Sequence, residues 1–172
     1  MFLNQQIEID TLPQISSVAL KPISKNYLKI ILLNKALVYV ICIGLVVLAG
    51  KFIIEKEELP DASMYIFGFA LLVCVCNLIL SILAFKKRKY AIRDKDIIYS
   101  KGLLVNSITT VPISRIQHIE ESRSWLARKL KLSTLKIFTA GESGSDLKID
   151  GLPFEEAKQI NDFLSAKVNG NH

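Results

Sequence analysis

Two long apolar stretches constrain this chain more than any other feature of its sequence. Residues 36–54 carry a single charge, on Lys51, and residues 64–85 carry none. Because a helix rises about 1.5 Å per residue, both stretches are long enough to cross a hydrocarbon core of about 30 Å. A soluble protein would need to be much larger than 172 residues to cover two helices that are apolar on every side. We therefore expect a transmembrane hairpin of two helices.

The composition agrees with a membrane anchor that carries one small domain. Hydrophobic residues make up 51% of the chain, and the mean hydropathy is +0.35. The sequence predicts an N-terminal segment over residues 1–35, transmembrane helices over 36–54 and 64–85, a short loop over 55–63, and a domain over 86–172. All three cysteines lie in the apolar stretches, where we expect them to pack as small side chains.

The charges that flank the hairpin predict its orientation. The loop over residues 55–63 is acidic, with Lys56 as its only basic residue. Basic residues stand on the other side of both helices: Lys21, Lys25, Lys29, Lys35, Lys86, Lys87, Arg88 and Lys89. The positive-inside rule then places both termini in the cytoplasm and the loop outside a cell (inner or plasma) membrane, as a multi-pass protein. We assign the run Lys86 to Lys89 mainly to this topology signal. Asn77 is the one amide of the second stretch, and we expect it to bond to the first helix or to another copy.

The remaining sequence predicts a small antiparallel β domain that is closed by a helix. Short β-branched or alternating segments lie over residues 90–93, 97–101, 105–113, 115–121, 134–139 and 146–149. A helical turn is expected over residues 125–130. The last helix begins at Pro153 and carries one apolar face: Phe154, Ala157, Ile160, Leu164 and Val168. The expected fold is an α+β membrane protein, with a two-helix hairpin and a pleckstrin-homology-like (PH-like) antiparallel β-barrel or sandwich capped by a C-terminal α-helix. The segment over residues 1–17 is left open as an arm, an added strand or disorder.

Several strings in this domain are characteristic. They are KYAIRDKDIIYSKGLL, TTVPISRIQHIE, WLARKLKLSTLKIFTAG and IDGLPFEEAKQI. In these strings the chain resembles the bacterial PH-domain (bPH2-type) membrane proteins of the YdbS-like family. The resemblance implies a cytoplasmic, membrane-tethered PH-like domain with no assigned reaction, and it departs at Lys131, where a small residue, often Gly, is expected. Its most specific residues, which we interpret as fold determinants, are Pro112, Arg115, Gln117, His118, Gly141, Gly151 and Pro153.

The sequence offers little chemistry for catalysis. His118 is the only histidine apart from His172 at the end of the chain, and we interpret it as a structural hydrogen-bonding residue. No cysteine, second histidine or serine motif accompanies it in a pattern typical of a catalytic triad or a metal site. We therefore expect no catalytic residues, no metal and no cofactor, and we predict that the protein is not an enzyme. Residues 90–172 hold twelve basic and ten acidic side chains, a balance that argues against nucleic-acid binding.

One basic segment is a candidate for lipid contact. Arg123, Arg128, Lys129 and Lys131 cluster around Trp125 in sequence. Tryptophan and basic residues are enriched at membrane interfaces, so this turn is a candidate contact for anionic headgroups. In the alternative interpretation, which we favour, Trp125 and Leu126 cap the core of the domain and the charges are solvated.

The leading functional hypothesis is a membrane-anchored PH-like interaction module without catalysis. It would bind a protein partner or its own copies at the cytoplasmic face, beside the bilayer that anchors it. The alternatives are sensing of anionic lipid by the basic turn around Trp125, or a role as an accessory subunit of an envelope or transport complex.

Overall fold

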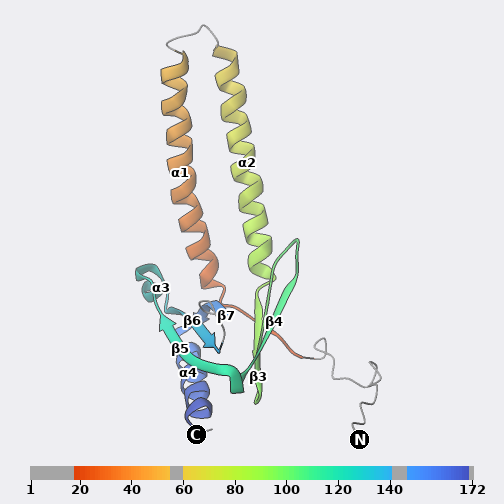
Figure 1. Cartoon of the computed structure of the whole chain (residues 1–172). Helices are drawn as coiled ribbons and strands as arrows, with labels where there is room; N and C mark the ends of the chain where they lie inside the picture. The colour runs from red at the N-terminus through yellow and green to blue at the C-terminus, as the bar shows by residue number, and fades with distance from the viewer. Residues whose placement is uncertain (1–17, 55–59, 141–146, 171–172) are drawn as a thin grey trace, which may run out of the picture.

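The computed structural model describes residues 18–54, 60–140 and 147–170. A long two-helix hairpin stands on a small domain of two sheets, which ends in a helix (Figure 1). The elements are β1 (Lys21–Pro22), α1 (Asn26–Ile54), α2 (Pro60–Lys86), β2 (Lys89–Ile92), β3 (Asp96–Lys101), β4 (Ser107–Pro112), the 3₁₀ turn η3 (Ile113–Arg115), β5 (Ile116–Ser122), α3 (Trp125–Lys129), β6 (Leu132–Thr139), β7 (Leu147–Pro153) and α4 (Phe154–Asn169). The open question about residues 1–17, and most of the predicted external loop, lie outside the described residues.

The two anchor helices are long, apolar and uncovered. The stretches Asn26–Gly50 and Met64–Lys86 have mean hydropathies of 2.5 and 2.7, and neither is buried inside the domain. A helix in the core of a soluble protein would be mostly covered, whereas these two run side by side away from the sheets (Figure 1). Helix α1 begins ten residues before the predicted transmembrane stretch, because residues 27–33 continue the apolar pattern.

A polar contact joins the two helices on their facing sides. The Oδ1 atom of Asn77 accepts hydrogen bonds from Lys35 Nζ at 2.5 Å and from the Tyr39 hydroxyl at 2.9 Å. Of the two arrangements left open for Asn77, the structure shows the bond to the first helix. Such a bond has few competitors in an apolar surrounding, so it fixes how the two helices pair.

Strands on both sides of the hairpin pair with each other. Before α1, β1 pairs with β2, which follows α2, and Lys21 lies opposite Tyr90. The first sheet therefore has the order β1-β2-β3-β4, with every neighbour antiparallel. A segment that precedes the membrane anchor is thus part of the domain that follows it, and the predicted boundary at residue 86 divides one folded unit.

The second sheet has the order β5-β6-β7, and α4 packs against its side of the domain. The two sheets do not share a hydrogen-bonded ladder among the described residues, so the domain is a sandwich rather than a closed barrel. Ala157, Ile160 and Leu164 of α4 are buried in the common core, which confirms the predicted apolar face. Pro153 is the residue before the helix rather than its first residue, because its extended backbone still belongs to β7.

Candidate functional site

Helix α3 is a short turn fixed by local bonds. Ser124 caps its start, because the hydroxyl oxygen accepts a hydrogen bond from Ala127 N at 3.2 Å. The inner face packs against the foot of α1, where Ala127, Leu132 and Ile30 form a small buried cluster. The outer face of α3 is therefore held at the domain-side end of the first anchor helix (Figure 1).

Trp125 lies on this outer face and is 63% exposed. Lys129 Nζ lies 4.0 Å from the centre of the indole ring, a cation–π contact that keeps the ammonium beside the ring. The interpretation that we favoured from the sequence, with Trp125 capping the core, is therefore wrong. Leu126 is partly buried and does pack against the small cluster around Ala127, as that interpretation had it.

The other basic residues of the turn do not form one cluster. Arg128 is exposed on α3, next to Lys129. Arg123 lies over the ring of Phe154 at 4.0 Å, and its Nε donates to the Leu132 carbonyl at 3.3 Å, so this side chain braces α4. Lys131 adopts φ +54°, the left-handed region in which glycine is favoured, which explains why a small residue is expected there. The surface that remains is Trp125 with Arg128 and Lys129, which we call the tryptophan turn.

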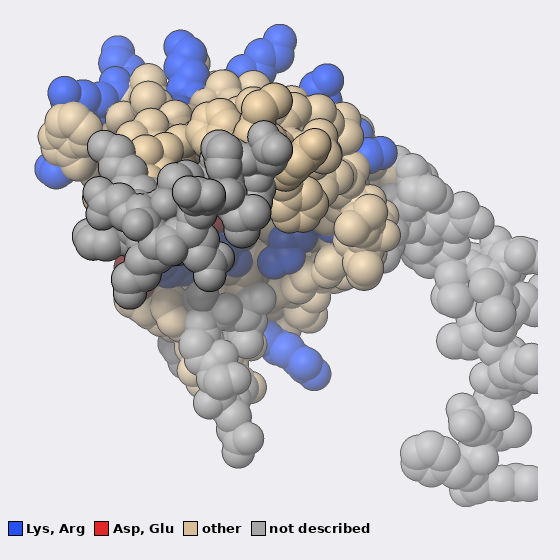
Figure 2. Space-filling model, turned by 90° about the horizontal axis from the view of Figure 1, so that it is seen from above, with Lys and Arg blue, Asp and Glu red and all other residues tan. Residues whose placement is uncertain are grey.

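Basic residues border the side of the domain from which the anchor helices leave. Figure 2, seen from above, shows many Lys and Arg side chains around this face and few Asp or Glu. In the run Lys86 to Lys89, the Arg88 guanidinium lies 5.8 Å from the ring of Tyr27, and Lys86, Lys87 and Lys89 are exposed. The arrangement suits a face that meets anionic headgroups.

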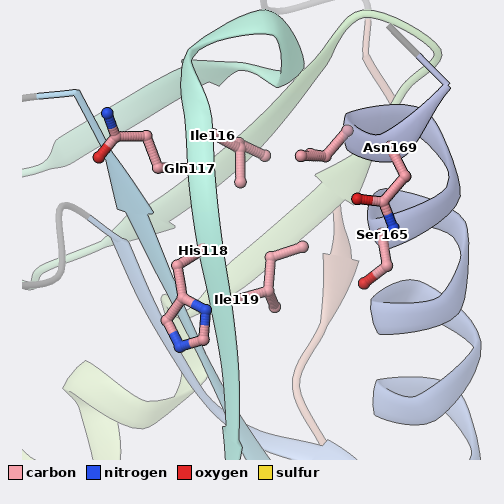
Figure 3. A pocket seen from close by; sticks show the side chains of 7 residues that line it. Ile116, Gln117, His118, Ile119, Ser165 and Asn169 are labelled. Atoms are coloured by element: carbon pink, nitrogen blue, oxygen red, sulfur yellow. The ribbon is translucent and has the colours of Figure 1, made fainter. Parts of the chain in front are cut away.

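A groove lies between β5 and α4, on another side of the domain. Its volume is about 170 Å³, and its lining residues are Ile116, Gln117, His118, Ile119, Ser165, Val168 and Asn169. Ile116 and Ile119 point toward α4, whereas Gln117 and His118 project from the other side of the strand (Figure 3). Among the described residues, β5 is an edge strand of its sheet, so backbone N–H and C=O groups face outward next to the groove.

The sequence missed this groove and also missed an exposed apolar tip. The turn between β3 and β4 carries Leu104, which is 90% exposed, and Val105, which is 79% exposed. Val105 had been predicted to begin the strand over residues 105–113, whereas β4 begins at Ser107, and Leu104 had been assigned to no element. The sequence signal for this tip was Gly102, a turn residue, followed directly by three apolar residues.

Comparison with known proteins identifies the family of this chain. The model of a family described as bacterial PH domain matches residues 28–168, most of the chain. The chain belongs to the bacterial PH-domain family. It is also 34% identical over 77 residues to the transmembrane protein YdbS of Bacillus subtilis (strain 168), a match that covers 45% of this chain and 46% of that protein. The chain thus matches about half of the length of this relative. No solved structure matches the chain significantly.

Gly151 is the family-type residue with the clearest structural reason. It has φ +76°, and a Cβ built on it would lie 2.5 Å from the Tyr27 ring. Its carbonyl also accepts a hydrogen bond from Ser24 N at 3.0 Å. In this bacterial PH domain, Gly151 therefore lets strand β7 lie directly against the base of the anchor.

Three further residues of the family pattern, Pro112, Arg115 and Gln117, lie where the chain passes from the first sheet to the second. Pro112 ends β4 and Arg115 ends η3, where the Arg115 carbonyl accepts from Ala140 N at 3.2 Å. The Arg115 side chain is exposed and makes no ion pair with the described acids. Gln117 sits at the irregularity of register in β5, and Gly141 lies outside the described residues.

His118 packs by its ring rather than by a buried hydrogen bond. The side chain is exposed, and its ring centre lies 5.6 Å from that of Phe138 on the neighbouring strand. The hydrogen-bonding role that we expected has no counterpart among the described residues. Within the same residues, no group of three His, Cys, Asp or Glu side chains is placed to hold a metal ion.

Proposed function

We propose that this chain is a non-enzymatic interaction module, held by its hairpin at the cytoplasmic face of the membrane, that binds an extended segment of a protein in the groove between β5 and α4. The observation that carries the proposal is the open edge of β5 beside that groove. An edge strand can add a further strand from another chain through backbone hydrogen bonds, while side chains of the added strand enter adjacent pockets.

The dimensions and lining of the groove favour a peptide over a small molecule. Its volume of about 170 Å³ is below the range of about 300–1,000 Å³ that is usual for small-molecule sites. The exposed lining is mostly polar, with Ser165 and Asn169 on the helix side, whereas Ile116 is buried beneath it (Figure 3). This lining suits an extended segment that is held mainly by hydrogen bonds.

The orientation in this proposal is supported by the charges. The flanks on the domain side of both helices are basic, and the predicted loop over 55–63 is acidic. Because the bias of Lys and Arg sets topology, the domain belongs on the cytoplasmic side. Protease treatment of intact spheroplasts should leave the domain intact, and permeabilised ones should lose it. Cleavage of the domain in intact spheroplasts would show that it lies outside the membrane, opposite to the proposed orientation.

Site-specific photo-crosslinking tests the groove. A photo-reactive amino acid replaces Ser165, on the groove side of α4, in the full chain in native membranes. The matched control replaces Gln159, an exposed residue on another face of the same helix. We expect a discrete adduct from position 165 that is absent from position 159, and mass spectrometry identifies it as a partner, an envelope complex or a second copy. Equal labelling at both positions, or none at position 165, would contradict the proposal.

A second candidate function is recognition of anionic headgroups by the tryptophan turn. The specific observation in its favour is the 63% exposure of Trp125 beside Lys129, at the foot of α1. An exposed indole with flanking cations is the chemistry of the membrane interface.

The sequence contains one tryptophan, so native fluorescence reports this turn alone. In nanodiscs of rising phosphatidylglycerol content, we expect a blue shift of Trp125 that high salt reverses, because the attraction is screened. Lys129→Gln should weaken the response. Lys158→Gln, at an exposed position of α4, is the control and should leave the response unchanged. A response that is independent of anionic lipid would exclude headgroup recognition.

A further inference from the structure

The turn between β3 and β4 carries an exposed apolar tip. Leu103, Leu104 and Val105 follow one another at its tip, and Leu104 and Val105 are 90% and 79% exposed. Leu103 is partly buried, so Leu104 and Val105 form the exposed part of the tip. Such a solvent-exposed apolar tip is unfavourable in water, so its surroundings in the protein's normal setting should be apolar.

The tip has a fixed shape. Gly102 has φ +108°, and a Cβ at this position would lie 1.9 Å from the Val105 carbonyl oxygen. The backbone therefore folds tightly onto itself in a conformation that other residues adopt only with strain. Below the turn, β3 and β4 pair over six residues, from Asp96↔Pro112 to Lys101↔Ser107. The three apolar residues are presented at the end of a paired two-strand arm.

The arm points toward the membrane anchor of the same chain. In Figure 1 the tip of the β3–β4 arm rises past the domain-side end of α2, parallel to that helix. The outer surface of α2 is already apolar and exposed close to this end, at Leu83 (41%) and Leu80 (45%). Leu83 is three residues from Lys86, which corresponds to about 5 Å along the helix. Lipid that covers Leu83 would therefore begin about one helical turn from the domain end of α2. The tip of the β3–β4 arm extends to this level (Figure 1).

The length of α2 fixes the level of the bilayer in the same way. From Met64 to Leu83, the helix covers about 30 Å, the thickness of a hydrocarbon core. Leu83, Leu80 and Ile79 are each more than two-fifths exposed. If the bilayer lay farther from the domain, these apolar side chains would face water. The membrane surface therefore lies against the domain rather than at a distance from it.

We infer that the β3–β4 tip, through Leu103, Leu104 and Val105, inserts into the interface of the leaflet that borders the domain and acts as a membrane contact separate from the transmembrane helices. The occupant is the lipid bilayer, because the tip extends toward the side of the domain from which the chain's own membrane span leaves (Figure 1) and carries no charge between Lys101 and Asn106. Lys101 at the end of β3 is exposed, in a position to meet headgroups when the tip is inserted. The inference depends on the membrane anchor and not on headgroup recognition by the tryptophan turn.

Single-tryptophan variants test the insertion in the full chain. Val105→Trp is made in a Trp125→Phe background, so that the tip holds the only tryptophan. The matched control is Lys95→Trp in the same background, in the exposed turn at the opposite end of β3. Both proteins are reconstituted in nanodiscs of phosphatidylcholine and phosphatidylglycerol, with and without brominated phosphatidylcholine.

We expect the tip tryptophan to emit at shorter wavelength, to be quenched by brominated lipid and to resist quenching by aqueous acrylamide. The control should show the opposite in all three measurements. Equal behaviour of the two positions would overturn the inference. A blue-shifted tip that brominated lipid does not quench would also overturn it, because protein rather than lipid would then cover the tip.

A second variant keeps the test valid if the new tryptophan itself promotes insertion. In Leu104→Ser/Val105→Ser, hydrogen exchange of the β3–β4 amides is measured in nanodiscs and in detergent. The native tip should lose protection when nanodiscs are replaced by detergent, and the double variant should show no such difference. Failure here leaves the groove crosslink and the Trp125 fluorescence to be judged on their own results.

Discussion

The two ends of strand β3 differ sharply in their chemistry. At one end the chain turns through Leu103, Leu104 and Val105, which carry no polar side chain. At the other end it turns through Arg93 to Asp96, where the Arg93 guanidinium is paired with the Asp96 carboxylate and Arg93 N donates to the Asp96 carbonyl at 2.9 Å. The apolar end lies on the side of the anchor helices, and the charged end lies away from them (Figure 1).

This difference agrees with our proposal that one end of the domain, the membrane-facing end, borders the bilayer and that the other end, the far end, does not. Gly151, Tyr27 and the β1–β2 pairing also belong to the membrane-facing end, where the anchor and the sheets are in contact. Close packing and backbone strain gather there, whereas the far end is held by exposed polar groups. Substitutions at the membrane-facing end should therefore lower the stability of the protein more than substitutions at the far end.

The largest effect is expected from Gly151→Val. A β-branched side chain at φ +76° is strained, and its Cβ would overlap the Tyr27 ring. Together these costs should lower the free energy of unfolding by about 3 kcal/mol or more. Thermal unfolding in detergent, followed by circular dichroism, measures the change. An unchanged midpoint would show that the junction between anchor and domain is not tightly packed.

Gly102→Ala should have the next largest effect. The new methyl group would meet the Val105 carbonyl, and φ +108° is unfavourable for alanine, so we expect a loss of about 2 kcal/mol. Hydrogen exchange should show that the loss is concentrated in the β3–β4 turn. Asp94→Ala, in the turn at the far end, is the control and should leave the exchange of that turn almost unchanged. Similar losses at both ends would remove the distinction between them.

A smaller effect should appear as a dependence of stability on pH. The Tyr90 hydroxyl donates to Glu156 at 2.5 Å, and burial followed by this hydrogen bond raises the pKa of Tyr90 above its usual value. Because the folded pKa lies above the unfolded value of about 10, the stabilisation is complete below pH 10 and is lost as pH rises beyond it. Tyr90→Phe should flatten the decline in stability between about pH 10 and 12. A decline of equal slope in the variant would assign it to other groups.

Arg93→Ala should have the smallest effect. The ion pair with Asp96 lies at the exposed far end, and surface pairs of this kind contribute little to stability. We expect no resolvable change in the unfolding midpoint at physiological salt, and no change in the tip fluorescence of the Val105→Trp variant. A large loss of either kind would mean that the far-end turn supports the whole arm.

The sequence predicted the elements whose signals are local. The length of the apolar stretches predicted the hairpin, and the helical spacing of Ala157, Ile160 and Leu164 predicted the buried face of α4. The resemblance to bacterial PH domains is confirmed by the family match over residues 28–168. These features depend on residues that are close together in the sequence, so the spacing of residue types is enough to predict them.

The features that the sequence did not predict depend on contacts between distant residues. Lys21 and Pro22 form a strand only because Tyr90 and Lys89 lie opposite them, beyond the whole hairpin. On α3, Trp125 is exposed while Ala127 is the residue that packs with the distant Ile30 of α1. The groove likewise arises where α4 crosses the edge of β5. None of these has a periodic pattern in the sequence.

The β1–β2 pairing has a consequence for how the protein is made. Strand β1 leaves the ribosome before either membrane helix, and its partner β2 follows only after both. If both helices span the bilayer, the two strands can meet only after the chain has crossed it twice and returned to its starting side. A chain that crossed once would leave them in separate compartments, with Tyr90 deprived of its neighbour. With that topology, β1 and β2 pair only in a chain whose two helices are both inserted.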